Sequence, residues 1–475
     1  MTVVGEQTGA QQSPPDQAAP AEAAAALVTA LQAEKAATEA AGATPAVRSD
    51  PATGTDGAPE PEQRPKPPGL WRNRDFILLW TGAGMAFLGG RVSAIAYTLL
   101  VFWSTGSATA AGLVGFAALL PNLLVQLPAG ALVDQWDRRK TMIICDVGRI
   151  VAVGGVFAAV LLGYVWVPLI MAAAFVEASL GVFYRLSERA AVRNVVDETQ
   201  LGAAMAGNEA RGQAAGLIGQ PVGTLFYALT RWMPFGFSAI AYLISLTTLL
   251  FIRKDLRVPL DEQGTPPRIL ARVREGFAFV WEQVYLLRAL SLIAASNILF
   301  QVLNLALIII VKDIGGSPAI IGFVLAVNGI GGMLGALSSN FFMKLIGIRR
   351  IIIFVNISWA VLMPLIAFAD NAVVLAAIYT AIVYGAGVSN VAGMVYQVKT
   401  TPNRMQGRVG SISMLLASGT NSIGALVAGF ALDGFGTVPA VLGVAAVMAL
   451  LAFLSVLGFG GKRAAEAEAA INITR

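Results

Sequence analysis

The chain has 475 residues, of which 56% are hydrophobic and 13% charged, with a formal net charge of +5. Soluble domains are typically about 25% charged, so this composition excludes a soluble protein and indicates an integral membrane protein. The chain has no histidine and one cysteine, which excludes imidazole catalysis, histidine-ligated metal sites and disulfides within the chain.

The first 69 residues differ from the rest of the chain. They hold ten of the 22 prolines, with nine acidic and four basic residues, and too few large apolar side chains to bury a core. We expect a disordered cytoplasmic tail at 1–69, with an alanine-rich run at 22–40 that is transiently helical. A docking segment for a partner is the alternative. We expect no signal peptide, because no basic region followed by a continuous apolar one precedes Leu70.

Apolar runs of about twenty residues follow, which is the length of a helix that crosses a bilayer. A transmembrane β-barrel would show alternating segments of about ten residues instead. The sequence therefore predicts an all-α membrane protein with twelve transmembrane helices, and the expected spans are 75–104, 107–133, 140–162, 166–187, 200–229, 233–252, 290–311, 318–343, 350–369, 372–397, 408–431 and 438–460.

A polar segment separates the first six spans from the last six. Its prolines are followed by a helix-like stretch from Ile269 to Leu287, which we expect to lie at the membrane surface with its basic face toward anionic lipid. The predicted organisation is a tail, a first six-helix half, a cytoplasmic linker, a second six-helix half and a cytoplasmic tail, at 1–69, 70–252, 253–289, 290–461 and 462–475.

Alternate loops differ sharply in basic residues. One set holds groups of Arg and Lys, including Arg185, Arg189 and Arg193, whereas the opposite set holds only Arg231 and Lys312. The positive-inside rule places the basic loops and both termini in the cytoplasm. The expected location is a bacterial inner or plasma membrane.

The two halves repeat short patterns at one offset. Gly130-Ala-Leu-Val-Asp134 ends the second span and Gly335-Ala-Leu-Ser-Ser339 ends the eighth, and the same offset relates Gly219 to Gly424. Such repeats predict two pseudo-symmetric six-helix halves, the internal symmetry of one class of transporter.

The loop between the second and third spans carries a recognisable motif, Gly130-Ala-Leu-Val-Asp134-Gln-Trp-Asp137-Arg138-Arg139-Lys140. It resembles the loop 2–3 signature of the major facilitator superfamily, in the form found in macrolide efflux proteins and the enterobactin exporter. The pair Gly407-Arg408 at the start of the eleventh span also fits. The resemblance covers Leu70 to about Arg463 and implies a transporter that works by alternating access.

This motif predicts a cytoplasmic latch between the halves. Gly130 would let the second span approach a neighbour closely, and Asp134 would accept hydrogen bonds from the basic residues of the loop or from a helix N-terminus. The resemblance places the start of the eleventh span, at Gly407 and Arg408, beside Asp134. The alternative is that the basic residues only set the membrane orientation.

The fifth span is rich in small residues. Antiporters of the superfamily often carry a Gly-Pro motif there, and here Gln220 interrupts that pair, so the resemblance to antiporters is partial. Tight helix packing and a proline kink account for the same residues, which are Gly212, Gly216, Gly219, Pro221 and Gly223.

Charged residues inside the spans are candidate coupling groups, because an unpaired charge in the membrane costs several kcal/mol. Arg91 and Glu177 lie near the middle of the first and fourth spans, and we expect them to face the central cavity and act together. Arginine stays charged, so Glu177 would carry the proton. Its protonation would release Arg91, which could then bind an anionic substrate or favour the other facing state. A permanent ion pair, or two separately hydrated residues, are the alternatives.

The other polar residues of the spans have different expected roles. Asp146 and Arg149 are three apart and should form a structural pair. Glu209 and Arg211 cannot face each other at their spacing, and Glu209 is the second candidate for the proton carrier. The second half has neutral amides instead, and those of the seventh span are expected to line the cavity: Asn297, Gln301 and Asn304.

The predicted function is proton-coupled efflux of amphipathic small molecules, such as antibiotics, siderophores or other metabolites. The alternatives are an importer, a lipid flippase similar to lysophospholipid transporters, and a non-transporting membrane scaffold that acts through its N-terminal tail. An enzyme is not expected, since no nucleophile–base pair or phosphate-binding loop is evident. We expect no cofactor and no nucleic-acid partner. The expected partners are the substrate, protons and the lipid bilayer, with the protein as a monomer.

Overall fold

The computed structural model describes residues 69–133, 135–254, 256, 269–402 and 405–459. Within these ranges the chain forms helices and connecting loops and no strand. The predicted N-terminal tail, the prolines of the linker and the C-terminal tail lie outside the described residues.

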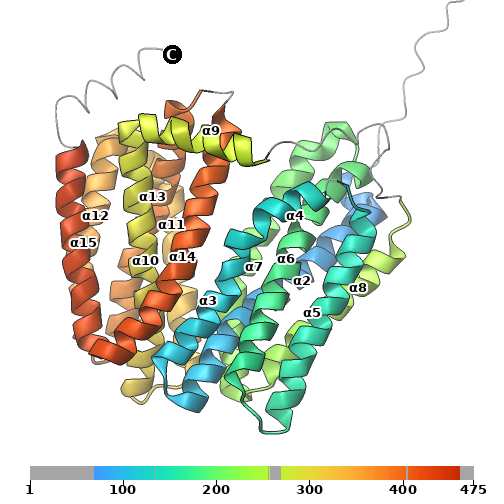
Figure 1. Ribbon diagram of the computed structural model, residues 1–475, viewed down its shortest axis with the longest axis horizontal. Helices are drawn as coiled ribbons and strands as arrows, with labels where there is room; N and C mark the ends of the chain where they lie inside the picture. The colour runs from blue at the N-terminus through green and yellow to red at the C-terminus, as the bar shows by residue number, and fades with distance from the viewer. Residues whose placement is uncertain (1–68, 134, 255, 257–268, 403–404, 460–475) are drawn as a thin grey trace, which may run out of the picture. The chain divides into compact units, whose positions relative to one another are not determined.

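The first half consists of six helical spans, as predicted (Figure 1). The second of these is divided, because Pro128 has no N–H to donate to the carbonyl of Leu124. The helices of this half are α2 (Arg74–Thr105), α3 (Ala108–Leu124) followed by α4 (Gln126–Val133), α5 (Arg138–Leu161), α6 (Val167–Val195), α7 (Leu201–Leu229) and α8 (Met233–Phe251).

The second half also has six spans. They are α10 (Val284–Asp313), α11 (Pro318–Ile346), α12 (Ile348–Ile366), α13 (Ala372–Thr400), α14 (Gln406–Phe435) and α15 (Thr437–Phe459). Ten of the described helices are each long and apolar enough to cross a membrane. The other two spans are the divided second one and α7, whose residues include Glu209 and Arg211.

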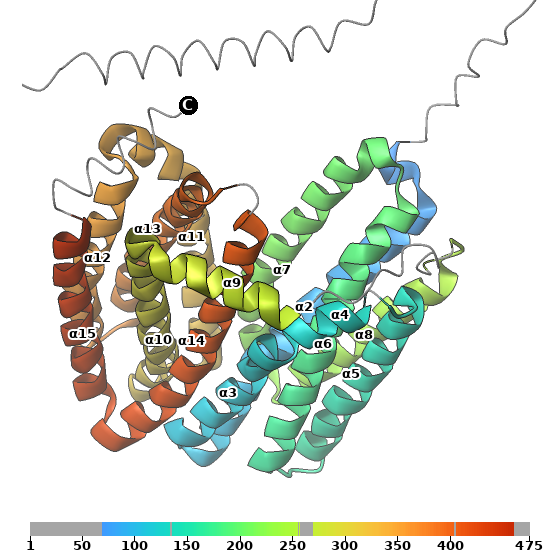
Figure 2. The same cartoon turned by 45° about the horizontal axis from the view of Figure 1, so that its top comes forward.

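The linker helix α9 (Ile269–Glu282) is shorter than predicted, because Gln283 separates it from α10. Figure 2 shows α9 beside α14. Val280 of α9 is buried in a small apolar cluster with Val409 and Ile412 of α14. One face of α9 therefore packs on the second half.

Glycine contacts confirm the predicted repeat between the halves. A Cβ added to Gly219 of α7 would overlap the Cβ of Arg91 in α2, and one added to Gly424 of α14 would lie 2.9 Å from the Cα of Ile298 in α10. In each half, the fifth span thus packs closely on the first.

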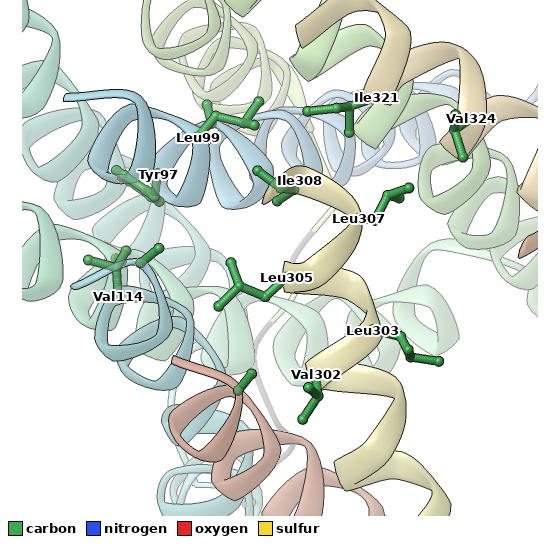
Figure 3. Packing of buried hydrophobic residues seen from close by; sticks show 14 of the residues in the cluster. Tyr97, Leu99, Val114, Val302, Leu303, Leu305, Leu307, Ile308, Ile321 and Val324 are labelled. Atoms are coloured by element: carbon green, nitrogen blue, oxygen red, sulfur yellow. The ribbon is translucent and has the colours of Figure 1, made fainter. Parts of the chain in front are cut away.

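The halves meet through a continuous apolar cluster (Figure 3). Leu99 of α2 and Ile308 of α10 belong to it, together with Ile321 of α11 and Val114 of α3. Helix α3 packs on α14, and α7 packs on α11. These four helices carry much of the contact between the halves.

Candidate functional site

Glu177 lies in the interior of the first half, enclosed by hydroxyl groups. Its side chain is 6% exposed. It accepts hydrogen bonds from Ser93 and Tyr97 of α2, each at 2.5 Å, and from Tyr242 of α8. We call these four residues the Glu177 cluster. Sequence reasoning identified Glu177 but not its partners, because they come from two other helices.

Arg91 and Glu177 do not meet. Among the described residues they form no ion pair, and Glu177 is bonded to hydroxyls instead. At about 100° per residue, Arg91 lies about 160° around α2 from Ser93, so the two point in nearly opposite directions. In this structure Glu177 is therefore not beside Arg91, and the expectation that both face the central cavity stays a prediction. A joint role of the two in coupling stays a prediction.

The Glu177 cluster continues into a second buried group. The guanidinium of Arg149 lies 4.6 Å from the ring centre of Tyr242 and 4.4 Å from that of Tyr184. Arg149 donates to Asp146 at 2.7 Å, which confirms the predicted structural pair. The second carboxylate oxygen of Asp146 accepts from Ser245 at 2.6 Å. The charge of Asp146 is thus balanced by Arg149 of the same helix, α5.

Arg211 of α7 has a partner that the sequence did not suggest. It forms a buried ion pair with Glu188 of α6 at 3.1 Å and donates to the carbonyl of Trp80 at 3.0 Å. Asn208 also donates to Glu188, at 2.9 Å. Glu188 was missed because the fourth span was expected to end at residue 187, whereas α6 continues to Val195. Glu209, by contrast, is exposed and accepts a hydrogen bond from Gln213 of its own helix.

Arg185 was counted among the basic loop residues, although it precedes the expected end of the fourth span, and it lies inside α6. Its Nη2 donates to Asn122 Oδ1 of α3 at 2.8 Å. Arg185 and Arg91 both keep solvent-accessible side chains, and within the described part of the chain neither forms an ion pair.

The predicted amides of α10 share one face of that helix. Gln301 donates to Asn421 of α14 at 3.2 Å, and Asn304 accepts from Tyr379 of α13 at 2.5 Å. Asn297 lies one turn from Gln301 on the same face. The interior of this half therefore presents neutral polar groups.

The loop motif makes its described contacts within the first half. Asp137 caps α5 by accepting from the amides of Arg139 and Lys140 at 3.0 and 3.1 Å. Arg138 donates to Asn194 of α6, and Arg139 donates to the carbonyl of Leu250 at 2.8 Å.

The predicted latch partners are only partly described. Gly130 and Gly407 have no atom within 4 Å of an added Cβ, and a close approach of a neighbouring helix at Gly130 stays a prediction. Arg408 pairs with Glu275 of α9. Asp134 lies outside the described residues, and the latch stays a prediction.

The small residues of α7 serve packing at two of the predicted positions. Besides Gly219, a Cβ on Gly223 would lie 2.8 Å from the carbonyl oxygen of Val92. Gly216 has open space around it, and Pro221 lies within the helix without ending it.

The halves are also joined at the other end of α3. Asp433 of α14 accepts hydrogen bonds from the amides of Ala108 and Thr109 at 2.8 and 2.7 Å and from the hydroxyl of Ser107 at 2.8 Å. Three residues further along α3, a Cβ on Gly112 would lie 2.7 Å from the Cα of Gly429. The backbones of α3 and α14 are in direct contact here.

Known proteins share both the sequence pattern and the fold. A major facilitator superfamily model described as "Transmembrane secretion effector" matches residues 69–472. Multidrug efflux pump Tap of Mycolicibacterium fortuitum is 28% identical over 396 residues, covering 80% of this chain and 94% of Tap. Macrolide efflux protein A of Streptococcus pyogenes is 23% identical, covering 76% and 90%. The crystal structure of the nucleoside transporter NupG superimposes with a TM-score of 0.63 at 16% identity, covering 82% of this chain and all of that one.

Proposed function

The chain belongs to the transmembrane secretion effector family of the major facilitator superfamily, and we propose that it exports amphipathic small molecules from the cell in exchange for protons. It is a multi-pass membrane transporter with a small-molecule substrate rather than an enzyme. The observation that carries the export proposal is the alignment with Tap, a multidrug efflux pump, over 80% of this chain and 94% of Tap.

Alternating access requires that the two halves part at one end and close at the other. At this end α3 and α14 meet through hydrogen bonds to Asp433 and a close backbone approach at Gly112. Such contacts can separate and form again, so they suit an end of the path that opens and closes in each cycle. The proposed latch at Asp134 would act at the opposite end of the second span.

Glu177 is our proposed proton carrier. Three other carboxylates lie within the described spans of the first half, away from the helix ends: Asp146 pairs with Arg149, Glu188 pairs with Arg211, and Glu209 is exposed. Glu177 is buried and hydrogen-bonded to hydroxyls. Its charge can therefore change without leaving a hydrogen-bonded cation unpaired.

The remaining assignments follow from the sequence. We place the basic loops and both termini in the cytoplasm, and the protein in the cell membrane. The proposed organisation keeps the divisions at residues 70, 253, 290 and 462. One chain supplies both halves, so a monomer is the proposed transport unit.

Everted membrane vesicles test the export proposal. Vesicles from a host that lacks its own drug pumps, energised by respiration, should accumulate ethidium or a macrolide in a saturable way. A protonophore should abolish this accumulation, and vesicles without the protein provide the control. Vesicles that contain the protein but accumulate none of a panel of cationic, neutral and anionic amphipathic compounds would overturn the proposal.

A further inference from the structure

Two arginines inside the first half are not neutralised by any described carboxylate. The buried acids Asp146 and Glu188 are paired elsewhere, and Glu177 is bonded to hydroxyls. Arg185 donates one hydrogen bond to Asn122, and no described group accepts a hydrogen bond from Arg91. A guanidinium at membrane depth is costly without a partner or water.

The two arginines lie on neighbouring helices near one another. Asn73 at the start of α2 donates to the carbonyl of Val195 at the end of α6, at 2.9 Å, which sets the two helices level at that end. A rise of about 1.5 Å per residue places Arg91 about 25 Å and Arg185 about 15 Å from it. The charge of Arg91 is close enough to act on Arg185, and protein atoms surround both side chains on most sides.

Both arginines are oriented away from the interior of the first half. Arg91 lies on the face of α2 opposite the Glu177 cluster, with its Cβ against Gly219 of α7. Arg185 reaches Asn122 of α3. Helices α7 and α3 are the ones that pack on α11 and α14 of the second half, so the two side chains lie between helices that border the second half.

The path is closed beyond Arg91. About two turns further along α2, Leu99 is fully buried in the cluster that contains Ile308 and Ile321 of the second half (Figure 3). Lys312 lies 4.3 Å from the ring centre of Phe102 beyond that. Arg91 nevertheless remains accessible, although protein atoms lie on most sides of its side chain.

The second half places no carboxylate beside these arginines from the described part of its helices. Asp313, Asp370 and Asp433 lie at helix ends or in a loop, and the interior polar groups are amides and hydroxyls. The two arginines therefore carry a positive charge that no described carboxylate of either half pairs with.

We propose that Arg91 and Arg185 together bind an anionic group, a carboxylate or phosphate, of the exported molecule. This inference rests on the proposed export function and adds amphipathic organic anions to its substrates. A guanidinium offers parallel N–H donors that match the two oxygens of such a group. Asn122 holds Arg185 in position for it.

Transport of two dyes tests this inference in everted vesicles. In wild-type vesicles we expect uptake of anionic carboxyfluorescein as well as cationic ethidium. Arg91→Gln and Arg185→Gln should each lower carboxyfluorescein uptake about tenfold, the loss of one charge-assisted contact, and should lower it more than they lower ethidium uptake. Arg193→Gln, which removes an exposed charge two turns further along α6, is the matched control and should change neither.

Binding of carboxyfluorescein to the purified protein, followed by fluorescence polarisation, separates this inference from the export function. Both glutamine variants should weaken binding about tenfold, and Arg185→Lys should restore part of it by keeping the charge. Unchanged binding in the glutamine variants, or no dye binding by the wild type, would overturn the anion site. If the wild type binds the dye in an arginine-dependent way but transports neither dye, the export function fails and the anion site stands.

Discussion

The carboxylate of Asp433 in α14 accepts the backbone N–H of Thr109 in α3 at 2.7 Å, across the boundary between the two halves. It also accepts from Ala108 and Ser107, so one side chain of the second half caps a helix of the first. A carboxylate at a helix N-terminus is favoured by the helix dipole and satisfies free amides. These bonds must break whenever the halves part at this end.

Asp433→Asn should favour the state that is open at this end. Loss of the charge weakens the cap by about 1 kcal/mol, which changes the ratio of open to closed molecules about fivefold. Labelling by a membrane-impermeant maleimide measures this ratio. The reporter is Leu305→Cys in a Cys145→Ser background, because Leu305 is buried between the halves. Asp370→Asn removes an exposed acid and should leave labelling unchanged. Equal labelling in both variants would contradict the role of Asp433.

Gly112→Val should prevent closure at the same end. Its Cβ would lie 2.7 Å from the Cα of Gly429, and neither backbone can give way without separating α3 from α14. Transport per molecule should fall about tenfold while labelling of the Leu305→Cys reporter rises. Gly115→Ala is the control, because its Cβ would make an ordinary contact with Ala425 at 3.5 Å. Normal transport by Gly112→Val would show that this close approach is dispensable.

Glu177→Gln should abolish proton-driven export while leaving downhill exchange of substrate and the amount of protein largely intact. The amide keeps the shape of the side chain and cannot take up a proton. Glu209→Gln serves as the matched control, since Glu209 is exposed and bonds only to Gln213 among the described contacts. If proton-driven export survives in Glu177→Gln and fails in Glu209→Gln, the carrier is Glu209.

Arg149→Met should destabilise the protein without a specific effect on coupling. Removing one member of a buried ion pair typically costs about 3–5 kcal/mol, because the other charge is left unpaired. The unfolding temperature in detergent should fall clearly, and Asp146→Asn combined with Arg149→Met should recover part of the loss. Arg231→Met, at an exposed loop position, should leave this temperature unchanged. An unchanged unfolding temperature for Arg149→Met would refute the structural role.

Asp134→Asn should lower turnover more than apparent substrate affinity, because a latch orders conformations and does not contact the substrate. Initial rates over a range of substrate concentrations separate maximal rate from KM. Lys140→Gln, in the same loop, tests whether loss of any loop charge has the same effect. A well-expressed Asp134→Asn protein with normal turnover would disprove the latch.

Local features of the fold were predictable from the sequence. The apolar runs predicted all twelve spans, and the spacing of Asp146 and Arg149 predicted their ion pair, because both depend on residues close along the chain. The break in the second span at Pro128 has a local cause as well, although it was not anticipated. The length of α6 was underestimated, since its last turns are polar, and this hid Glu188.

Contacts between distant helices were not predictable in the same way. Arg91 and Glu177 lie at similar depth, but depth does not specify the angle around a helix, and that angle separates them. Asp433 and Thr109 are 324 residues apart. No local pattern marks Asp433 as a cap for a helix of the other half.

The hydroxyl groups around Glu177 bear on how this side chain would release a bound proton. A hydroxyl can both donate and accept, so Ser93, Tyr97 and Tyr242 can bond to a protonated carboxyl as well as to a carboxylate. Neutralising Asp146, in contrast, would strand Arg149 in the interior. A transported ion must leave as readily as it enters. If Glu177 carries the proton, its cluster would meet that condition, because loading and unloading would reorient hydroxyl protons and dismantle no ion pair in each cycle.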